Sequence, residues 1–169
     1  SIQFLEESTD ASFSGSTYTS GSIMKYCIVE YSDYLYIYRS RPFINYSEFR
    51  YNSVAGISVY NDDSSDSDLL VTNCDIHHNK QGVQVNGSGY TKTLFSYNTI
   101  RDNTSNGGGY VSSSTFSYNT IKNNTVSGDG HRKGGGVKID GTDFDHNLIS
   151  GNSNSSSNMA AAGLYMYNG

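Results

Sequence analysis

The densest group of reactive side chains in the sequence lies in residues 128–133. This stretch contains Asp129, His131, Arg132 and Lys133, with glycine on either side of the aspartate. Side chains of these types donate and accept protons, so together they could perform acid–base catalysis. The same glycine-containing composition is typical of a solvated loop, and we prefer that interpretation to a catalytic one.

Carboxylates gather in a second stretch, residues 61–68, which contains Asp62, Asp63, Asp66 and Asp68. Ca²⁺ is a hard cation that takes about six to eight oxygen ligands, and carboxylates with Ser and Asn oxygens can supply them. The spacing does not match an EF-hand loop, which needs a glycine at its sixth position and a closing glutamate. Calcium is therefore one hypothesis for this stretch, and a solvated acidic turn is the preferred one.

Two further pairs of residues could form sites. Asp143 and Asp145 flank Phe144, so both carboxylates face outward if Phe144 points into a core. Inverting glycoside hydrolysis needs two carboxylates about 6.5–9.5 Å apart, which makes this pair a weak catalytic candidate. His77 and His78 are adjacent, and adjacent residues of a strand point to opposite faces, so we do not expect them to share a metal.

Composition narrows the class of protein. The chain has 169 residues, of which only 35% are hydrophobic and 16% charged, yet it contains 15 Tyr and 7 Phe. Disordered chains are poor in aromatic residues, so disorder fits badly. The net charge of −5, without a cluster of Lys and Arg, argues against nucleic acid as a partner. No apolar run approaches about 18 residues, so no membrane-spanning helix is expected.

A repeat must position all of these residues. The segment Phe95 to Asn103 returns 21 residues later as Phe116 to Asn124, with the pattern Phe-x-Tyr-Asn-x-Ile-x-x-Asn. Further copies align with it without internal gaps, at spacings of 20 to 28 residues. The position aligned with Asn98, here called the ladder position, is occupied in successive copies by Cys27, Ser47, Cys74, Asn98, Asn119 and Asn147.

Each copy carries two apolar columns, three residues before and two residues after the ladder position, and a column rich in Asn five residues after it. A second element with alternating apolar residues follows most copies, beginning at Gly56, Gly82, Gly109, Gly136 and Gly163. Alternation with period two is typical of strands with one buried face. The pattern predicts an all-β fold, a parallel β-helix of about six to seven coils with three short strands each. Stacked Asn side chains should pass hydrogen bonds from coil to coil.

Two other columns of the repeat matter for the surface: one is expected to face outward, and the direction of the other is left open by the sequence. Tyr26, Tyr46, Tyr97 and Tyr118 directly precede the ladder position, and the sequence leaves open whether they face in or out. If they face outward, their rings could pack on sugar rings or simply cover the coil edge. A separate outward column mixes charges and leans basic; it comprises Glu30, Arg50, His77, Arg101 and Lys122.

The two cysteines share the ladder position but stand two coils apart. Cys27 and Cys74 should therefore be separated by about 9.6 Å, twice the spacing of adjacent strands. A disulfide needs Cα atoms within about 7 Å of each other. We therefore expect two buried free thiols.

Three segments, Phe95 to Asn98, Phe116 to Asn119 and Phe144 to Asn147, match Phe-x-x-Asn, and glycine runs at 107–109 and 134–136 precede the last two. These motifs resemble the right-handed parallel β-helix superfamily that includes the pectate lyases, and the repeats of polymorphic outer-membrane and autotransporter adhesins. The resemblance covers roughly residues 20–169. Its lyase members bind Ca²⁺ through acidic residues on one sheet and use a basic residue to take a proton, but their strongest signatures are not visible here. Sharing a fold does not imply sharing an activity.

These observations favour an extracellular or cell-surface protein with a structural or adhesive role. We expect residues 1–169 to form one β-helix domain that is a segment of a longer chain or of a fibre built by head-to-tail association. A polysaccharide or cell-surface glycan is the expected partner. The alternative is a polysaccharide lyase or glycoside hydrolase of the pectate-lyase-like superfamily.

Overall fold

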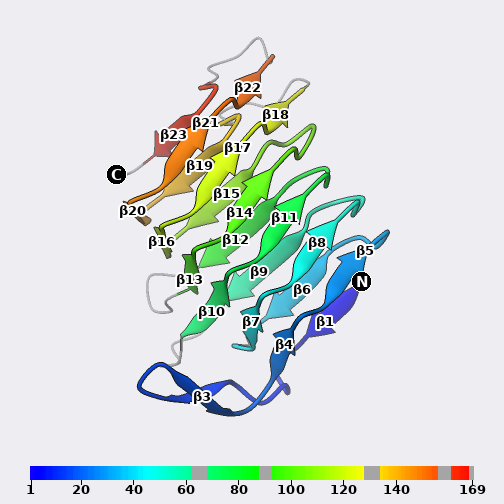
Figure 1. Cartoon of the computed structure of the whole chain (residues 1–169), viewed down its shortest axis with the longest axis vertical. Coiled ribbons are helices and arrows are strands. Elements are labelled where there is room, and N and C mark those ends of the chain that lie inside the picture. Colours follow the sequence, from blue (N-terminus) through cyan, green and yellow to red (C-terminus); the bar gives the residue numbers. More distant parts are fainter. Residues whose placement is uncertain (62–67, 88–92, 128–133, 156–160, 168–169) are drawn as a thin grey trace.

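The fold is an all-β solenoid whose strands stack along the long axis of the molecule (Figure 1). The computed structural model describes residues 1–61, 68–87, 93–127, 134–155 and 161–167. No residue in these ranges is helical, so none of them belongs to a helix that could cross a membrane. The blue N-terminal strands and the red C-terminal strands lie at opposite ends of the stack.

Three parallel sheets form the sides of the solenoid, because each strand pairs with the equivalent strand of the next coil. The first sheet contains β1 (Ile2–Phe4), β6 (Leu35–Tyr38), β9 (Ile57–Asn61), β12 (Val83–Gly87), β15 (Gly109–Ser112), β19 (Val137–Asp140) and β23 (Leu164–Tyr167). The second contains β4 (Ile23–Lys25), β7 (Phe43–Asn45), β10 (Leu69–Thr72), β13 (Thr93–Ser96), β16 (Thr115–Ser117) and β20 (Asp143–Asp145). The third contains β5 (Ile28–Glu30), β8 (Glu48–Arg50), β11 (Asp75–His77), β14 (Thr99–Arg101), β17 (Thr120–Lys122) and β21 (Leu148–Ser150).

Two small sheets complete the described strands. β18 (Thr125–Val126) pairs in parallel with β22 (Ser153–Asn154). β2 (Ser12–Ser14) and β3 (Thr17–Ser20) form an antiparallel hairpin near the N-terminal end of the stack. The ring of Phe13 in this hairpin packs edge-on against Phe43 of the second sheet, with centroids 5.3 Å apart.

The core follows the columns that the repeat predicts. Phe95 pairs with Phe116, which pairs with Phe144, and the successive ring centroids lie 5.9 and 5.7 Å apart. Ile100 pairs with Ile121 in the third sheet, and both side chains are buried. The predicted fold class, a parallel β-helix with three short strands in each coil, is therefore confirmed.

The register differs from the sequence alignment at one glycine. Gly109, which the alignment placed opposite Gly82, pairs instead with Val83, so Gly108 takes the glycine position. A Cβ on Gly108 would lie 2.1 Å from the carbonyl oxygen of Gly136, so only glycine fits there. A run of three glycines offers no side-chain pattern, and the sequence could not show which of them stacks.

Buried asparagines connect the coils in two ladders. Asn103 is typical: its Nδ2 donates to the carbonyl of Ile76 at 3.0 Å and to Oδ1 of Asn124 at 2.9 Å. Its own Oδ1 accepts from the backbone N–H of Asn79 at 2.9 Å. The same arrangement recurs at the predicted ladder position, where Asn98 donates to Asn119 and to the carbonyl of Val71. The predicted passage of hydrogen bonds from coil to coil is confirmed, and it occurs in both asparagine columns.

The residue before each ladder asparagine, not the asparagine itself, takes the left-handed backbone that the corners need. At the first corner the residues with positive φ are Tyr26, Tyr46, Asn73, Tyr97, Tyr118 and His146. At the second corner they are Tyr31, Tyr51, His78, Asp102, Asn123 and Gly151. This conformation costs a residue other than glycine about 1–2 kcal/mol. It also turns the side chain out of the coil, so the tyrosine column faces solvent.

The two cysteines differ in their surroundings. Both are free thiols, as predicted, and Cys74 is buried, but Cys27 is exposed. The expectation that both are buried is wrong because Cys27 connects β4 and β5, the edge strands of the second and third sheets. In the described residues no further strand of either sheet stacks below them.

The ladder makes a testable contribution to stability. Asn103→Ala is expected to lower the free energy of unfolding by about 2–4 kcal/mol, because it leaves the buried Ile76 carbonyl and Asn79 N–H without their partners. Urea unfolding measures this change. Ser96→Ala, on the outer face of β13, is the control and should cost about 0.5 kcal/mol or less. Similar losses in the two variants would contradict the role assigned to the ladder.

Thiol labelling tests the positions of the cysteines. Burial raises the pKa of Cys74 to about 12, so its reactive thiolate is scarce at neutral pH. At about pH 8 a thiol reagent should modify Cys27 in the folded protein and reach Cys74 only after unfolding in urea. The Cys27→Ser variant should then show almost no labelling while folded. Equal labelling rates for the two thiols in the folded protein would refute this assignment.

Candidate functional site

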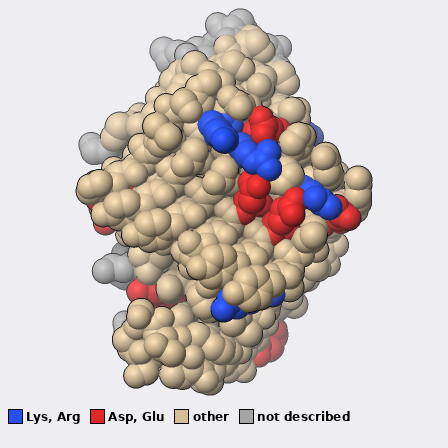
Figure 2. All heavy atoms as spheres, in the orientation of Figure 1, with Lys and Arg blue, Asp and Glu red and all other residues tan. Residues whose placement is uncertain are grey.

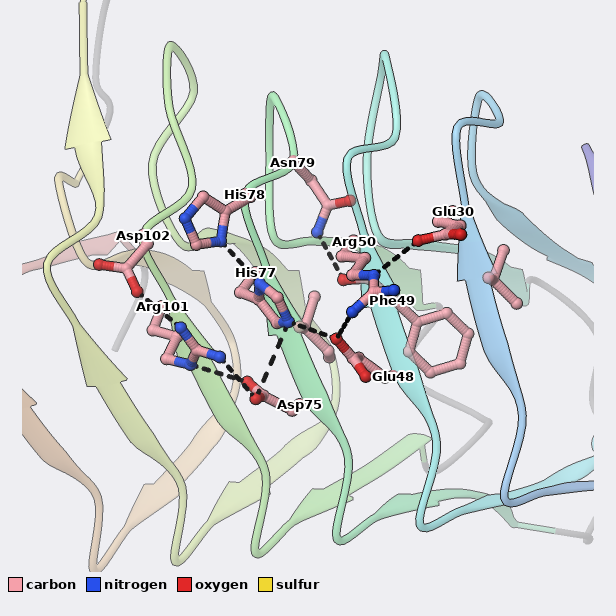
Figure 3. Close-up of polar contacts among 12 residues, drawn as sticks. Glu30, Glu48, Phe49, Arg50, Asp75, His77, His78, Asn79, Arg101 and Asp102 are labelled. Carbon is pink, nitrogen blue, oxygen red and sulfur yellow. Dashed lines mark hydrogen bonds and ion pairs between the residues drawn. The ribbon is translucent and has the colours of Figure 1, made fainter.

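Charged side chains gather on the outer face of the third sheet. Figure 2 shows acidic and basic residues clustered together on a surface that is otherwise mostly uncharged. The cluster comprises Glu30, Glu48, Arg50, Asp75, His77, Arg101 and Asp102, contributed by β5, β8, β11 and β14 with the corner that follows (Figure 3). We call this group the charged network.

The strand register brings these residues together. Each strand of the third sheet has three residues, of which the middle one points into the core and the outer two point outward, as with Glu48 and Arg50 around buried Phe49. β8 and β11 pair so that Glu48 lies beside Asp75 and Arg50 lies beside His77. Residues that are 20 to 29 positions apart in sequence therefore form one surface.

Two arginines hold the carboxylates in place. Arg50 donates from Nε to Glu30 at 2.6 Å and from Nη1 to Glu48 at 2.8 Å. Arg101 binds both oxygens of Asp75, at 3.1 and 2.8 Å, and this two-pronged geometry is the strongest form of carboxylate pairing. Hydrogen bonding to Asp75 raises the pKa of Arg101 although partial burial opposes it, so the guanidinium stays charged.

His77 and His78 contact each other, contrary to the expectation from their adjacency. Their Nδ1 atoms lie 2.6 Å apart, and Nε2 of His77 lies 2.8 Å from Oε1 of Glu48. The expectation of opposite faces assumed a continuing strand, but β11 ends at His77 and His78 has a φ of 54°. This corner turns the second ring back over the first.

The hydrogen bonds assign a direction to this chain of side chains. An ionised Glu48 only accepts, so His77 donates from Nε2, and in its neutral form it accepts at Nδ1. His78 then donates from Nδ1, which leaves its Nε2 as a free acceptor; this tautomer follows from the network. The chain from Glu48 through His77 thus fixes the orientation of the exposed His78 ring.

Two opposing effects set the pKa of the Glu48 carboxyl group. Its partial burial raises the pKa of the carboxyl, but hydrogen bonds from His77 and Arg50 outweigh burial and lower the pKa below its ordinary value. The carboxylate therefore stays ionised to a lower pH than an ordinary glutamate does. His77 is buried by its neighbours, with only 6% of its surface exposed.

A groove of about 390 Å³ runs beside the charged network. Its lining residues are Tyr26, Cys27, Ile28, Tyr46, Ser47, Glu48, Asn73 and Asp75. Tyrosine rings from the first corner form one side of the groove, and Glu48 and Asp75 form the other. It therefore combines aromatic surface with carboxylate oxygens, a pairing that suits polar ligands with an apolar face.

Those candidates predicted from sequence that the structure describes lie away from the charged network. Asp129, His131, Arg132, Lys133, Asp62, Asp63 and Asp66 fall outside the described residues. Asp68 precedes β10 and lines a second groove, of about 500 Å³, next to the β2–β3 hairpin. Asp143 and Asp145 are exposed on β20 of the second sheet, on either side of Phe144, and Asp145 contacts His146. Among the described residues no cluster of three or more His, Cys, Asp or Glu side chains is suited to hold a metal ion.

Sequence reasoning identified four of the seven residues of the charged network, namely Glu30, Arg50, His77 and Arg101. It found the outward column of Arg50, His77 and Arg101, but not the parallel column that contains Glu48 and Asp75. The signal was available, because both acids stand two positions before an outward basic residue on the same strand. Aligning that position across the copies places the two acids in adjacent coils, between Ile28 and Thr99.

The fold defines a class, the parallel β-solenoids in which stacked polar side chains connect the coils. A comparison with family models then names the family more closely: the model described as a right handed beta helix region matches residues 4–169. The chain belongs to this right-handed β-helix family. Searches of curated proteins and of solved structures gave no match.

Glu48 gives a pH-dependent prediction. Because its pKa is lowered in the folded state, the stability it contributes is present above the ordinary pKa of a glutamate and is lost as the pH falls through the lowered value. Glu48→Gln should reduce the free energy of unfolding by about 1–2 kcal/mol at neutral pH. The difference from wild type should shrink below about pH 4.

Urea unfolding at several pH values measures this difference. Glu30→Gln is the matched control: Glu30 also binds Arg50, but it lies on the edge strand β5 and is more exposed. Its loss should be about 0–1 kcal/mol. A Glu48→Gln difference that stays constant from neutral to acidic pH would contradict the lowered pKa.

Proposed function

We propose that this β-helix has an extracellular structural or adhesive role and binds glycans on its outer surface. The observation that carries the proposal is the column of outward tyrosines at the first corner, which adjoins the groove of about 390 Å³. Tyr97 is 59% exposed and Tyr46 51% exposed, so the fold does not use these rings to build its core. Aromatic surface that the fold leaves in solvent at repeated positions is available to a partner.

The chemistry of this surface fits a carbohydrate. A tyrosine ring has an electron-rich face, which attracts the C–H groups on the flat side of a sugar ring, and a hydroxyl that hydrogen-bonds at its edge. Glu48 and Asp75, on the other side of the groove, offer carboxylate oxygens to sugar hydroxyls. The repeat places such groups along the solenoid, so a chain-like glycan could contact several coils.

A polysaccharide lyase or glycoside hydrolase is the second candidate. The hydrogen-bonded chain of Glu48, His77 and His78 favours it, because an exposed histidine held in one tautomer can act as a general base. We rank it second because Glu48 is already bound by His77 and Arg50, and Asp102, at the same corner of the next coil as His78, is bound by Arg101. Calcium at residues 61–68 and head-to-tail association belong to the proposal as further expectations, to be tested by calcium binding and by electron microscopy.

Binding and turnover can be measured on the same samples. The protein should be retarded in gels that contain neutral or acidic polysaccharides, and should release no unsaturated or reducing ends with or without Ca²⁺. Replacing Tyr97 and Tyr118 together by Ala should weaken binding by about tenfold or more, since two rings are lost. Ser96→Ala with Ser117→Ala alters the same coils, keeps the rings and serves as the control.

Two results would overturn this proposal. Absence of binding to every polysaccharide tested would remove the glycan-binding role. Release of unsaturated or reducing ends that is lost in His78→Ala would establish the catalytic alternative instead.

A further inference from the structure

We infer that the tyrosine column contains a binding slot for a single neutral pyranose ring, at the coil where Asn73 replaces tyrosine. This inference rests on the proposed glycan-binding function and assigns it a place and a ligand class. The first-corner column comprises Tyr26, Tyr46, Asn73, Tyr97, Tyr118 and His146. Every member except Asn73 has an aromatic ring, so one ring is missing from the interior of the column.

The rings on either side of Asn73 each have one covered face. Tyr46 stacks on Tyr26 with centroids 5.6 Å apart, and Tyr97 stacks on Tyr118 with centroids 5.1 Å apart. The planes of the two pairs deviate from parallel by 14° and 9°, respectively. The other faces of Tyr46 and Tyr97 therefore look toward the coil of Asn73, where the column has no ring.

The spacing of the coils sets the size of the slot. Tyr46 and Tyr97 are two coils apart, which corresponds to about 9.6 Å along the stack. A ring placed midway would lie about 5 Å from each tyrosine, within the range of about 4.5–7 Å over which rings pack. A six-membered sugar ring is similar in size to the tyrosine ring that occupies this position in the other coils, so it fits the same space.

Asn73 leaves the slot open. Its Nδ2 donates to Oδ1 of Asn45 at 3.2 Å and to Oγ1 of Thr72 at 3.1 Å, so the amide lies along the coil edge. The groove of about 390 Å³ adjoins the slot on the side of Tyr46: Asn73, Tyr46, Glu48 and Asp75 line it, whereas Tyr97 does not. The floor and one side of the slot therefore carry amide and carboxylate oxygens.

The charges favour a neutral sugar over a charged one. Asp75 is held by Arg101 through both oxygens, and Glu48 by Arg50 and His77, so neither carboxylate needs a cationic ligand. Their remaining lone pairs can accept hydrogen bonds from hydroxyl groups. A uronic acid would bring a third carboxylate beside these two, which is unfavourable and is offset only in part by Lys25, whose Nζ lies 5.8 Å from the centroid of the Tyr46 ring.

Filling the slot is the sharpest test. Asn73→Tyr restores the missing ring at a position whose backbone conformation tyrosine adopts in the neighbouring coils. The stacking it gains offsets the hydrogen bonds to Asn45 and Thr72 that it loses, so the variant should fold and unfold close to the wild-type temperature. Isothermal titration with cellohexaose, mannohexaose and β-1,4-galactohexaose should detect binding of at least one probe by wild type. Asn73→Tyr should weaken that binding by about tenfold or more, as should Tyr97→Ala.

The matched control is Asn123→Tyr. Asn123 is an exposed asparagine with a φ of 55° at the second corner, so the same substitution is made in the same backbone conformation, away from the slot. It should bind the probe as wild type does. Hexagalacturonate and choline, as an acidic sugar and a cation, should bind wild type at least tenfold more weakly than the neutral probe, by about 1.4 kcal/mol.

The outcomes separate this inference from the proposed function. If wild type binds a neutral probe and Asn73→Tyr binds it equally well, the slot is refuted while glycan binding stands. Preference for hexagalacturonate refutes the neutral ligand class but keeps glycan binding. Preference for choline, or no binding of any sugar probe, refutes the slot as a sugar site.

Discussion

The coil depends on hydrogen bonds made by buried asparagine side chains. Interior ladder asparagines such as Asn103 link three coils: the side chain donates to a carbonyl of the preceding coil and to an amide oxygen of the next, and it accepts a backbone N–H. These side chains satisfy backbone groups at corners where no strand partner exists, and an unsatisfied buried group costs about 1–3 kcal/mol. In a chain with little apolar surface, such bonds give the corners their fixed geometry.

The strained residue at each corner follows from the ladder. To turn the asparagine inward, the preceding residue must adopt a left-handed backbone, and this points its side chain into solvent. Tyrosine at that site, as at Tyr97 and Tyr118, recovers part of the cost by stacking on the next coil. The outward aromatic column and the inward polar ladder are therefore two results of one corner geometry.

Most of the fold could be predicted from sequence because the repeat is regular. Phe95 and Phe116 recur with their neighbours, and equal environments in stacked coils require equal residues. The site was harder to predict, because it depends on contacts between coils. His78 does not follow the alternation of side chains along a strand, because its positive φ ends the strand at His77. Glu48 contacts His77 only because β8 pairs with β11. The run of glycines at 107–109 carries no side chains that could fix its register.

The left-handed corner residues have a consequence for how this surface can change. Their side chains lie outside the core, so replacing one tyrosine by asparagine, as the column has at Asn73, leaves the core columns and the ladders untouched. The outer surface and the core are thus encoded by different positions of the repeat. Surface residues can therefore be substituted one coil at a time with little effect on folding. Solenoids with the same core can in this way evolve to bind different partners.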